Sequence, residues 1–203
     1  PKYPEPHWNL ALIQLLLNDY KLGWQKYQWR FKKRIPIVIH AQPRIKLWQG
    51  EQLHPEEKLL VISEQGLGDT IQYMRYIPYL RQLGIDISFC AQPKLHSLIK
   101  GSNIDSNPLT ADQANSITEG KWIPLLSIPK YLQITPENPI VSEPYISTPY
   151  ELISKWKNIL SKEKRPIIGI NWQGNPEMEK THKGRSFELE TFSILLDKND
   201  ITF

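Results

Sequence analysis

The stretch Lys58-Leu-Leu-Val-Ile-Ser63, followed by Glu64-Gln-Gly-Leu-Gly-Asp-Thr70, decides the fold class of this chain. The first part is an apolar run of strand length, and the second places two glycines and an aspartate before a segment with helical spacing. A buried strand that enters a helix through a glycine turn is typical of sheets whose parallel strands alternate with helices. We therefore expect an α/β fold, and the question is whether the turn holds a ligand or only redirects the chain.

The same alternation continues downstream. The spacing predicts a helix over about 69–83, a strand at 85–90 and a short helix at 93–100, followed by a looser stretch to 150. Pro78 lies inside the first of these helices, where it removes an amide and should kink the helix or split off its last turn. Residues 58–150 are therefore expected to form a parallel sheet flanked by helices.

A second unit of the same kind follows at 151–203. Its expected elements are a helix at 151–162, a buried strand at 165–171, a long polar loop at 172–187, a helix at 187–198 and a strand that starts at Ile201. The chain begins at Pro1 rather than at Met and stops at Phe203, just inside that strand. We expect it to be a piece of something longer.

The N-terminal region reads as a helical hairpin. Residues 7–17 are largely apolar, and residues 20–33 place aromatic side chains at spacings of four, three and four, from Tyr20 to Phe31. Residues 1–34 are therefore expected to form two antiparallel helices, and such a pair cannot bury both faces alone. The prolines and glycine of residues 35–57 show no period, so this segment is expected to be a connector.

Composition excludes several classes of protein. Hydrophobic residues make up 40% and charged residues 23% of the 203 positions, which is the globular range. The basic residues behind the net charge of +4 are spread along the chain without a nucleic-acid-binding motif, so we expect no nucleic acid partner. No apolar run approaches the ~20 residues of a membrane helix, so no membrane span and a cytoplasmic location are expected. Cys90, the single cysteine, is expected to be a buried, inert thiol.

The glycine turn admits two readings. Gly66 can adopt a positive φ, Gly68 lets a ligand approach the backbone, and the helix start supplies free amides. The turn lacks the third glycine of the dinucleotide fingerprint and the Gly-Lys-Ser/Thr of a phosphate-binding loop. Asp69 is either an N-cap of the helix or a general base at the edge of the sheet where ligands bind. Both roles stay open on the residues alone.

A second candidate site follows the strand at 165–171. Lys180, Lys183 and Arg185 lie in a loop that ends at a helix start, with Ser186 as a possible cap, which suits an anion. The alternative is a solvated basic loop. His182 is the one histidine expected near a site, and the other histidines show no metal-ligand spacing, so no metal is expected.

Several stretches, taken together, resemble a known family. The hairpin pattern Asn9-Leu-Ala-Leu12 with Gly23-Trp-x-x-Tyr-x-Trp-Arg30 resembles the last tetratricopeptide unit of bacterial repeat proteins, although an ordinary amphipathic hairpin is an equal alternative. The other stretches are Trp48-Gln-Gly50, Glu64 to Gln72 with Arg75-Tyr-Ile-Pro78, Pro124 to Pro129, and Gly169 to Pro176 with Arg185-Ser186. In this order they resemble the glycosyltransferase region that follows tetratricopeptide repeats in many bacterial proteins, related to the heptosyltransferases.

The resemblance implies a glycosyltransferase with two Rossmann-like lobes (GT-B type), transferring a sugar with inversion and without a metal. Residues 58–150 would form the acceptor lobe and 151–203 a linker helix and the truncated start of the donor lobe. It implies Asp69 as the base, with an acceptor-site loop of Glu64, Gln65, Gly66, Gly68 and Gln72. The implied donor-binding residues are Asn171, Gln173, Gly174, Asn175, Lys183, Arg185 and Ser186. The implied partners are a nucleotide-sugar, which is a co-substrate and not a cofactor, and an acceptor that is a glycan, lipid or protein. A protein bound by the repeat region is a further partner that the resemblance allows.

The chain also departs from the family. Lys180-Thr-His-Lys-Gly184 stands where the family tends to have an acidic, Asn-rich segment, and the part of the donor lobe that should bind the base and ribose would follow Phe203. We therefore expect the chain alone to be inactive. A non-catalytic tetratricopeptide-type interaction module with a degenerate α/β lobe is the second hypothesis. A nucleotide-dependent oxidoreductase is the third, and Cys90-Ala-Gln92 in place of an acidic strand end argues against it.

Overall fold

The structure is a computed structural model that describes residues 3–54, 56–141, 143–175, 184, 186–195 and 200–202. It contains two compact units, Pro1–Pro149 (the sheet unit) and Tyr150–Phe203 (the C-terminal unit), each described by itself below. The elements of the sheet unit are α1 (Pro4–Leu16), α2 (Tyr20–Tyr27), η1 (Gln28–Phe31), β1 (Lys46–Leu47), β2 (Leu59–Ile62), α3 (Leu67–Tyr73), α4 (Tyr76–Gln82), β3 (Ile87–Cys90), η2 (Pro93–Leu95), α5 (His96–Gly101), α6 (Ala111–Asn115), β4 (Lys121–Pro124), η3 (Leu125–Ser127) and α7 (Ile128–Leu132). Those of the C-terminal unit are α8 (Tyr150–Leu160) and η4 (Leu189–Leu195).

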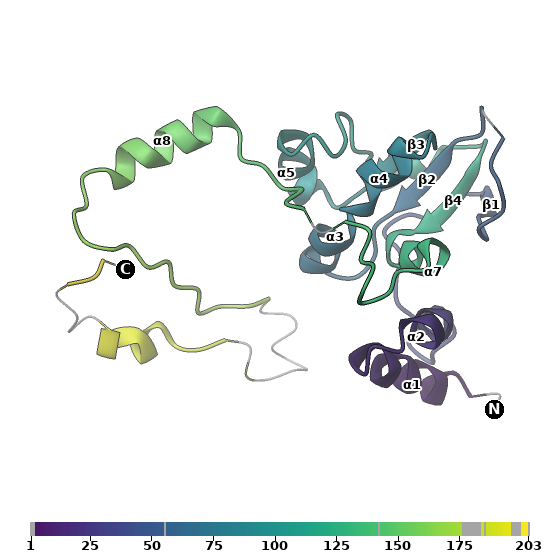
Figure 1. Cartoon of the computed structure of the whole chain (residues 1–203), viewed down its shortest axis with the longest axis horizontal. Helices are drawn as coiled ribbons and strands as arrows, with labels where there is room; N and C mark the ends of the chain where they lie inside the picture. Colours follow the sequence, from purple (N-terminus) through teal and green to yellow (C-terminus); the bar gives the residue numbers. More distant parts are fainter. Residues whose placement is uncertain are drawn as a thin grey trace. The chain divides into compact units, whose positions relative to one another are not determined.

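The sheet of the first unit has four parallel strands in the order β1-β4-β2-β3 (Figure 1). Strand β2 is central, because Leu59 pairs with Ile87 of β3 on one side and with Lys121 of β4 on the other. The connection from β2 to β3 therefore moves in one direction across the sheet, and the connection from β3 to β4 returns past β2. The expected α/β fold with a parallel sheet and flanking helices is confirmed, and the strand order reverses between β2 and β4, the kind of position where open α/β sheets bind ligands.

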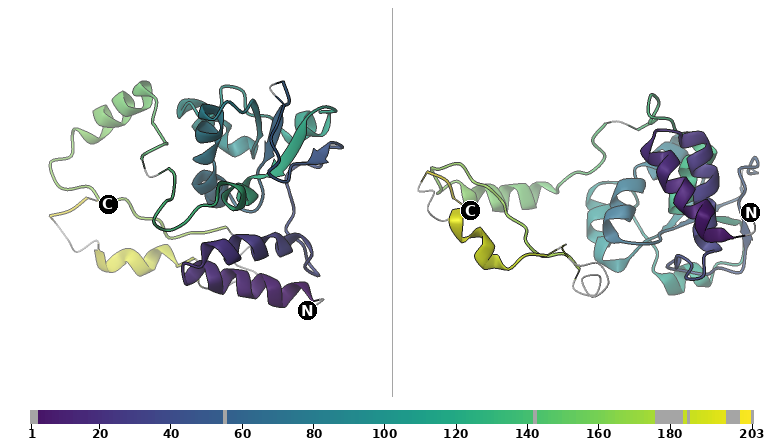
Figure 2. Two further views of the ribbon diagram at one scale, coloured as in Figure 1. Left: turned by 45° about the vertical axis from the view of Figure 1, so that its right-hand side comes forward. Right: turned by 90° about the horizontal axis from the view of Figure 1, so that it is seen from below.

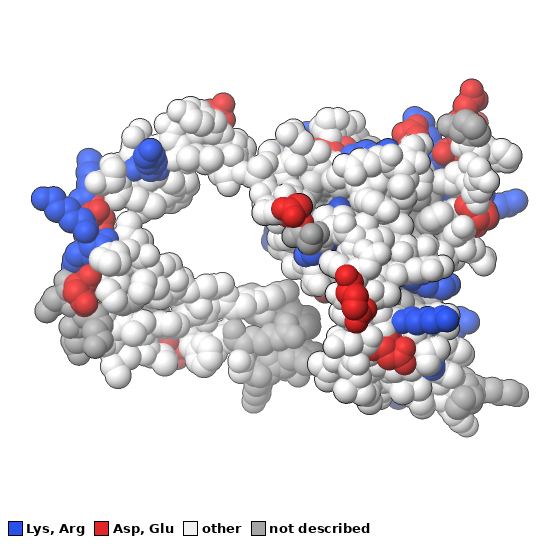
Figure 3. Space-filling view, in the orientation of Figure 1, with Lys and Arg blue, Asp and Glu red and all other residues white. Residues whose placement is uncertain are grey.

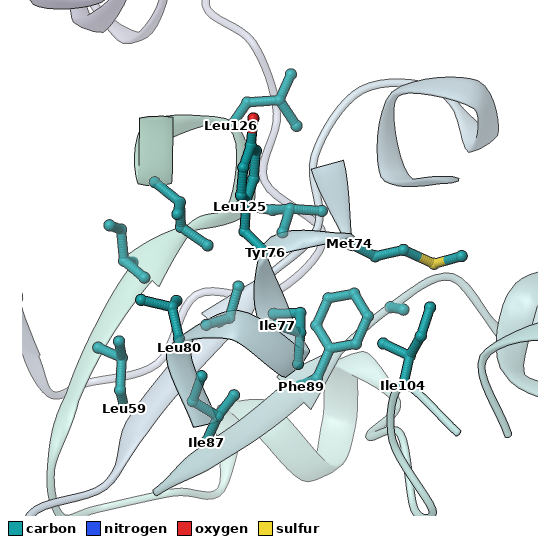
Figure 4. Packing of buried hydrophobic residues seen from close by; sticks show 14 of the residues in the cluster. Leu59, Met74, Tyr76, Ile77, Leu80, Ile87, Phe89, Ile104, Leu125 and Leu126 are labelled. Atoms are coloured by element: carbon teal, nitrogen blue, oxygen red, sulfur yellow. The ribbon is translucent and has the colours of Figure 1, made fainter. Parts of the chain in front are cut away.

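Alternate residues of β2 belong to two separate cores. Leu59 and Val61 pack with Phe89, Ile123 and the helices α4 and α7, as the side chains in Figure 4 show for part of this cluster. Leu60 and Ile62 face the smaller cluster on the opposite side of the sheet. That cluster contains Ala41 of the segment before β1, Cys90 of β3 and Ala114 of α6. Both faces of the sheet are covered, which is why β2 reads as an unbroken apolar run.

Cys90 lies at the end of β3 and is fully buried. Burial raises the pKa of the Cys90 thiol to about 11, because the thiolate loses its hydration there. The expected burial of Cys90 is confirmed.

The helix expected at 69–83 is two helices. Helix α3 starts at Leu67 and ends at Tyr73, and α4 runs from Tyr76 to Gln82. Pro78 has no amide to donate to the carbonyl of Met74, and its ring crowds that carbonyl, so the chain breaks one turn before the proline. The break divides the segment in half instead of removing its last turn.

The stretch before residue 150 is more ordered than the sequence suggested. It contains α6, β4 and α7, and the connector at 35–57 contains the two-residue strand β1. The sequence pattern does not predict strand β4, because the strand is only four residues long and ends in a proline. Its place beside β2 comes from long-range pairing, which local periodicity does not report.

Helices α1 and α2 run side by side as the expected hairpin (Figures 1 and 2). Gly23 of α2 makes the close approach possible, since a Cβ there would lie 2.8 Å from Cγ of Leu15. Ala11, Trp24 and Tyr27 are buried and belong to the same cluster as the large core of the sheet. The hairpin is thus built into the sheet unit rather than appended to it.

The C-terminal unit begins with α8, close to the helix expected at 151–162. Ile167 pairs with Thr202 in a parallel bridge, and the Ile168 amide donates to the Thr202 carbonyl at 2.9 Å. The expected helix at 187–198 is the 3-10 helix η4 within its described part. No described residue of this unit is buried, and residues 165–171 pair only through the single bridge at Ile167, so the buried strand expected there is wrong.

Among the described residues, no helix is long and apolar enough to cross a membrane. On the face drawn in Figure 3, lysine and arginine side chains are interspersed with acidic ones.

Candidate functional site

The loop 64–70 leaves the carboxyl end of β2 and enters α3, as the sequence predicts. Its backbone differs from expectation in one respect. Gly66 is extended, with φ −86° and ψ 170°, and acts as the N-cap of α3, whereas Gln65 adopts the left-handed conformation with φ 62°. Gly66 therefore does not use the positive φ that a glycine can adopt, and Gln65 has the left-handed conformation instead. Gln65 can hold this costly conformation because its side chain is anchored, its Nε2 donating to the Tyr27 hydroxyl at 3.0 Å.

Asp69 occupies the third position of α3 rather than the N-cap. Its Oδ2 accepts a hydrogen bond from the Gly66 amide at 2.9 Å, which satisfies one donor at the helix start. Asp69 thus caps the helix start from the third helical position instead of the N-cap position. The Asp69 side chain remains partly exposed. A Cβ on Gly68 would meet no atom within 4 Å, and Gln72 is exposed one turn later. Asp69, Gly68 and Gln72 therefore border open space at the carboxyl edge of β2.

Glu64 does not border that space. Its side chain is fully buried and forms a bidentate ion pair with Arg30. Nε of Arg30 donates to Oε2 of Glu64 at 2.9 Å, and Nη2 of Arg30 donates to Oε1 of Glu64 at 2.7 Å. The Leu126 amide also donates to Oε1 at 3.1 Å. Glu64 was expected to belong to a loop that contacts the acceptor. Its two carboxylate oxygens are instead bound inside the protein, so its side chain is not available to an acceptor.

The Arg30 guanidinium lies between the ends of β2 and β4, where the strand order of the sheet reverses. It donates to the Tyr27 carbonyl at 3.1 Å and to the Ser127 hydroxyl at 2.8 Å, and it is itself fully buried. Glu64 follows β2, and Ser127 follows β4. The hairpin, through η1, thus fills the crevice between the carboxyl ends of β2 and β4, a usual ligand position in open α/β sheets. We call Arg30, Glu64, Leu126 and Ser127 the switch-point cluster.

Gln92, two residues after β3, holds the other side of the loop. Its Oε1 accepts from the Thr70 hydroxyl at 2.9 Å, and its Nε2 donates to the Gly66 carbonyl at 3.4 Å. Thr70 is fully buried. The loop is thus held by the hairpin on one side and by the end of β3 on the other. These contacts fix the backbone that carries the Asp69 carboxylate.

His40 is a residue that sequence reasoning missed. Its Nδ1 lies 2.8 Å from Oγ of Ser63, the buried residue just before Glu64, and the two backbones also pair at this point. Burial lowers the pKa of His40, and the neighbouring Glu64 carboxylate opposes the shift. His40 also lines a groove of about 630 Å³ together with Arg44 and Asn115. No local signal marks His40, because its partner is 23 residues away.

The second candidate site is only partly within the described residues. Asn171, Gln173 and Gly174 lie on an exposed turn, in which Oδ1 of Asn171 accepts from the Gln173 amide at 3.3 Å. The Gly174 amide donates to the Ser186 hydroxyl at 3.0 Å, so both ends of the long loop meet. Asn175 is exposed beside them. Lys183 and Arg185, with Lys180 and His182, lie outside the described residues.

A groove of about 630 Å³ borders this turn. Gln173 and Ser186 line it, and so do the acidic residues Glu188 and Glu190. Among the lining residues no side chain is basic. An anion in this groove would therefore depend on the basic residues of the loop 176–185.

Within the described residues there is no group of three or more histidine, cysteine, aspartate or glutamate side chains that could hold a metal ion. Comparison of the chain with protein-family models, with curated proteins and with solved structures finds no match, so the family resemblance rests on its sequence motifs.

Proposed function

We propose that this chain carries the acceptor lobe and the start of the donor lobe of a glycosyltransferase, which moves a sugar from a nucleotide-sugar to an acceptor hydroxyl. The observation that carries the proposal is the placement of Asp69. Its carboxylate is held by the Gly66 amide at the carboxyl edge of β2, beside the uncrowded Gly68. Open α/β sheets bind ligands at this edge, and Asp69 lies on it beside the switch point that Arg30 fills.

In the proposed reaction Asp69 accepts the proton of the acceptor hydroxyl as that oxygen attacks the anomeric carbon of the donor. The carbon gains positive character while its bond to the diphosphate breaks, and attack from the opposite side inverts its configuration. Lys183 and Arg185, with the helix start after Ser186, would stabilise the negative charge of the leaving diphosphate, which is the role of a metal in other transferases. Acceptor contacts would come from Gln65, Gly68 and Gln72, and not from Glu64.

The parallel bridge between Ile167 and Thr202 supports the donor-lobe part of the proposal, because a second strand-helix-strand unit would pair the segments before and after its helix in parallel. The hairpin α1–α2 would be the last unit of a tetratricopeptide array. Its packing into the sheet core supports the idea that such an array ends directly on the acceptor lobe.

The burial of Glu64 favours a second candidate. A motif residue engaged in an internal ion pair gives the loop 64–70 a structural purpose that needs no substrate. In that case the chain is a non-catalytic interaction module with a degenerate α/β lobe, and Asp69 serves only as a helix cap.

Calorimetric titration of the complete protein with UDP, GDP and ADP, and with their common sugar conjugates, separates the two candidates. The transferase proposal expects one nucleotide to bind, and Arg185→Ala to weaken it by about tenfold, since a charge-assisted contact to phosphate is lost. Asp69→Asn should keep that binding and lose transfer. Asp112→Asn, an acid in the first turn of α6, is the matched control and should change neither. Absence of binding by every nucleotide would leave the interaction module as the better account.

A further inference from the structure

Helix α8 of the C-terminal unit has one apolar side. At 3.6 residues per turn its apolar residues share a stripe about 120° wide. We call this set the α8 stripe: Leu152, Ile153, Trp156, Ile159 and Leu160. The five side chains are between 42% and 53% exposed, and neither of the two hydrophobic clusters contains any of them. Within the described part of the chain, the α8 stripe is therefore left uncovered.

Lysines stand at both edges of the α8 stripe. At about 100° per residue around the helix, Lys155 lies about 40° beyond Ile159 on one edge, and Lys157 lies about 40° beyond Ile153 on the other. Both lysines are exposed. Neither forms an ion pair with another described residue. The stripe is thus apolar along its middle and cationic along both sides.

The charge around α8 has one predominant sign. Residues 150–165 contain five basic and two acidic side chains. Of the two acids, Glu163 is paired with Arg165, with Oε1 to Nε at 3.1 Å. Glu151 lies in the first turn of α8, where a negative charge complements the helix dipole. The lysines at the edges of the stripe therefore belong to a segment of net positive charge.

We propose that α8 binds an anionic lipid surface, lying in its plane with the α8 stripe among the upper acyl chains. A helix with lysine on its polar side and tryptophan and leucine on the other is typical of such binding. The lysine stems can follow the apolar surface while their ammonium groups reach the lipid phosphates. The indole ring of Trp156 suits the same depth, because it is apolar with one polar edge.

The distribution of charge decides between this occupant and others. Cations on both edges of the stripe are complementary to a surface that is negative on both sides of the helix, which a plane of anionic headgroups is. A second copy of α8 would instead bring four edge lysines together around the paired stripes, and like charges at close range repel. The inference does not depend on the chemistry proposed for Asp69.

Sedimentation of the complete protein with lipid vesicles tests the proposal. The probes are vesicles of phosphatidylcholine with phosphatidylserine, and vesicles of phosphatidylcholine alone. We expect binding to the first kind only, and weaker binding at high ionic strength. The double variant Lys155→Gln, Lys157→Gln should weaken binding about 25-fold, since each lysine near such a surface contributes about fivefold. Trp156→Ser should weaken it by at least about tenfold through the loss of buried apolar area.

Fluorescent labels on two introduced cysteines report which side of α8 meets the lipid. Leu152→Cys lies in the stripe and Asn158→Cys lies on the opposite side, and the native Cys90 is fully buried. A nitroxide on the lipid acyl chains should quench the label at position 152 and spare the label at position 158. Equal quenching of the two labels would contradict the proposed orientation.

Matched controls make each outcome decisive. Lys94→Gln with Lys100→Gln removes the same charge from two exposed lysines of the sheet unit and should leave the affinity unchanged. Lys155→Arg with Lys157→Arg keeps the charge and should keep the binding. No binding to either kind of vesicle, equal binding to both, or indifference to the Lys155 and Lys157 variants would overturn the proposal.

Two further results would assign the α8 stripe to another partner and would overturn the proposal as well. One is displacement of the protein from vesicles by poly-glutamate that binds as tightly as the lipid, which would indicate an acidic protein. The other is a dimer in analytical ultracentrifugation that Trp156→Ser dissociates, which would indicate a second copy of the chain. Circular dichroism confirms that each variant is folded.

Discussion

The two strand-loop-helix connections of this chain look alike in sequence and differ in what holds them. The loop after β2 is held by Arg30 and Tyr27 from the hairpin and by Gln92 from the end of β3. In the loop 172–187, the hydrogen bonds from the Gln173 amide to Oδ1 of Asn171 and from the Gly174 amide to the Ser186 hydroxyl join described residues of the loop itself. A glycine-rich turn after a strand therefore predicts where a loop begins, but it does not reveal the distant residues that hold the loop 64–70 in place.

The largest expected contrast is in hydrogen exchange. The Ser63 amide donates to the Cys90 carbonyl and the Ile168 amide to the Thr202 carbonyl, both at 2.9 Å. Ser63 is buried in the sheet unit, so its exchange should require global unfolding, at about 5–15 kcal/mol. Ile168 is exposed, and its opening should cost less than about 2 kcal/mol. Similar protection of the two amides would show that the comparison drawn above is mistaken.

The second expected effect is on the switch-point cluster. Arg30→Met leaves the Glu64 carboxylate buried without its partner and should lower the free energy of unfolding by about 3–5 kcal/mol. Urea denaturation followed by tryptophan fluorescence measures this. Arg44→Met, at an exposed arginine, should change it by less than about 0.5 kcal/mol.

The double variant Arg30→Met, Glu64→Met sharpens that measurement. Because it removes both charges, it should be clearly more stable than the sum of the two single changes predicts. Additive effects would mean that the two side chains do not act as a pair.

A matched pair of smaller changes compares the two loops. Asp69→Ala and Ser186→Ala each remove one side-chain acceptor of a glycine amide, at 2.9 Å and 3.0 Å. Asp69→Ala should destabilise the sheet unit by about 0.5–2 kcal/mol, the usual cost of a lost helix cap. Ser186→Ala should leave the unfolding transition of that unit unmoved, since Ser186 lies in the other unit. A loss of equal size in both variants, measured by the same denaturation, would contradict this.

The smallest expected effect concerns pH. The pKa of His40 is lowered in the folded protein, so the unfolded chain binds the proton more tightly. The stability that depends on His40 is therefore complete above its ordinary pKa of 6.5 and is lost as the pH falls below that value. Denaturation at pH 7.5 and at lower pH should show a steeper decline for the wild type than for His40→Gln. Among the described residues, Ser63 contacts His40, and the Glu64 charge and the backbone of Gln65 and Ser63 oppose the shift of its pKa.

How far the sequence predicts this structure depends on the range of the interaction involved. Strands β2 and β3 and the hairpin follow from apolar periodicity, which is local. Strand β4 and the pair Arg30–Glu64, 34 residues apart, depend on contacts that periodicity does not encode. Gln65 shows the same limit on a small scale: glycine is the residue expected at a positive φ, but the hydrogen bond to Tyr27 lets a glutamine adopt it.

The switch-point cluster limits how the helical hairpin can be exchanged between proteins. A helical hairpin is an easy module to shuffle between proteins when its contacts with the neighbouring domain are apolar and tolerant. Here the hairpin brings a buried cation whose acceptors are Glu64 and Ser127, so a domain that receives it must supply a carboxylate and a hydroxyl at the ends of two different strands. A graft of the hairpin or of the sheet alone would therefore carry an unpaired charge into its new core.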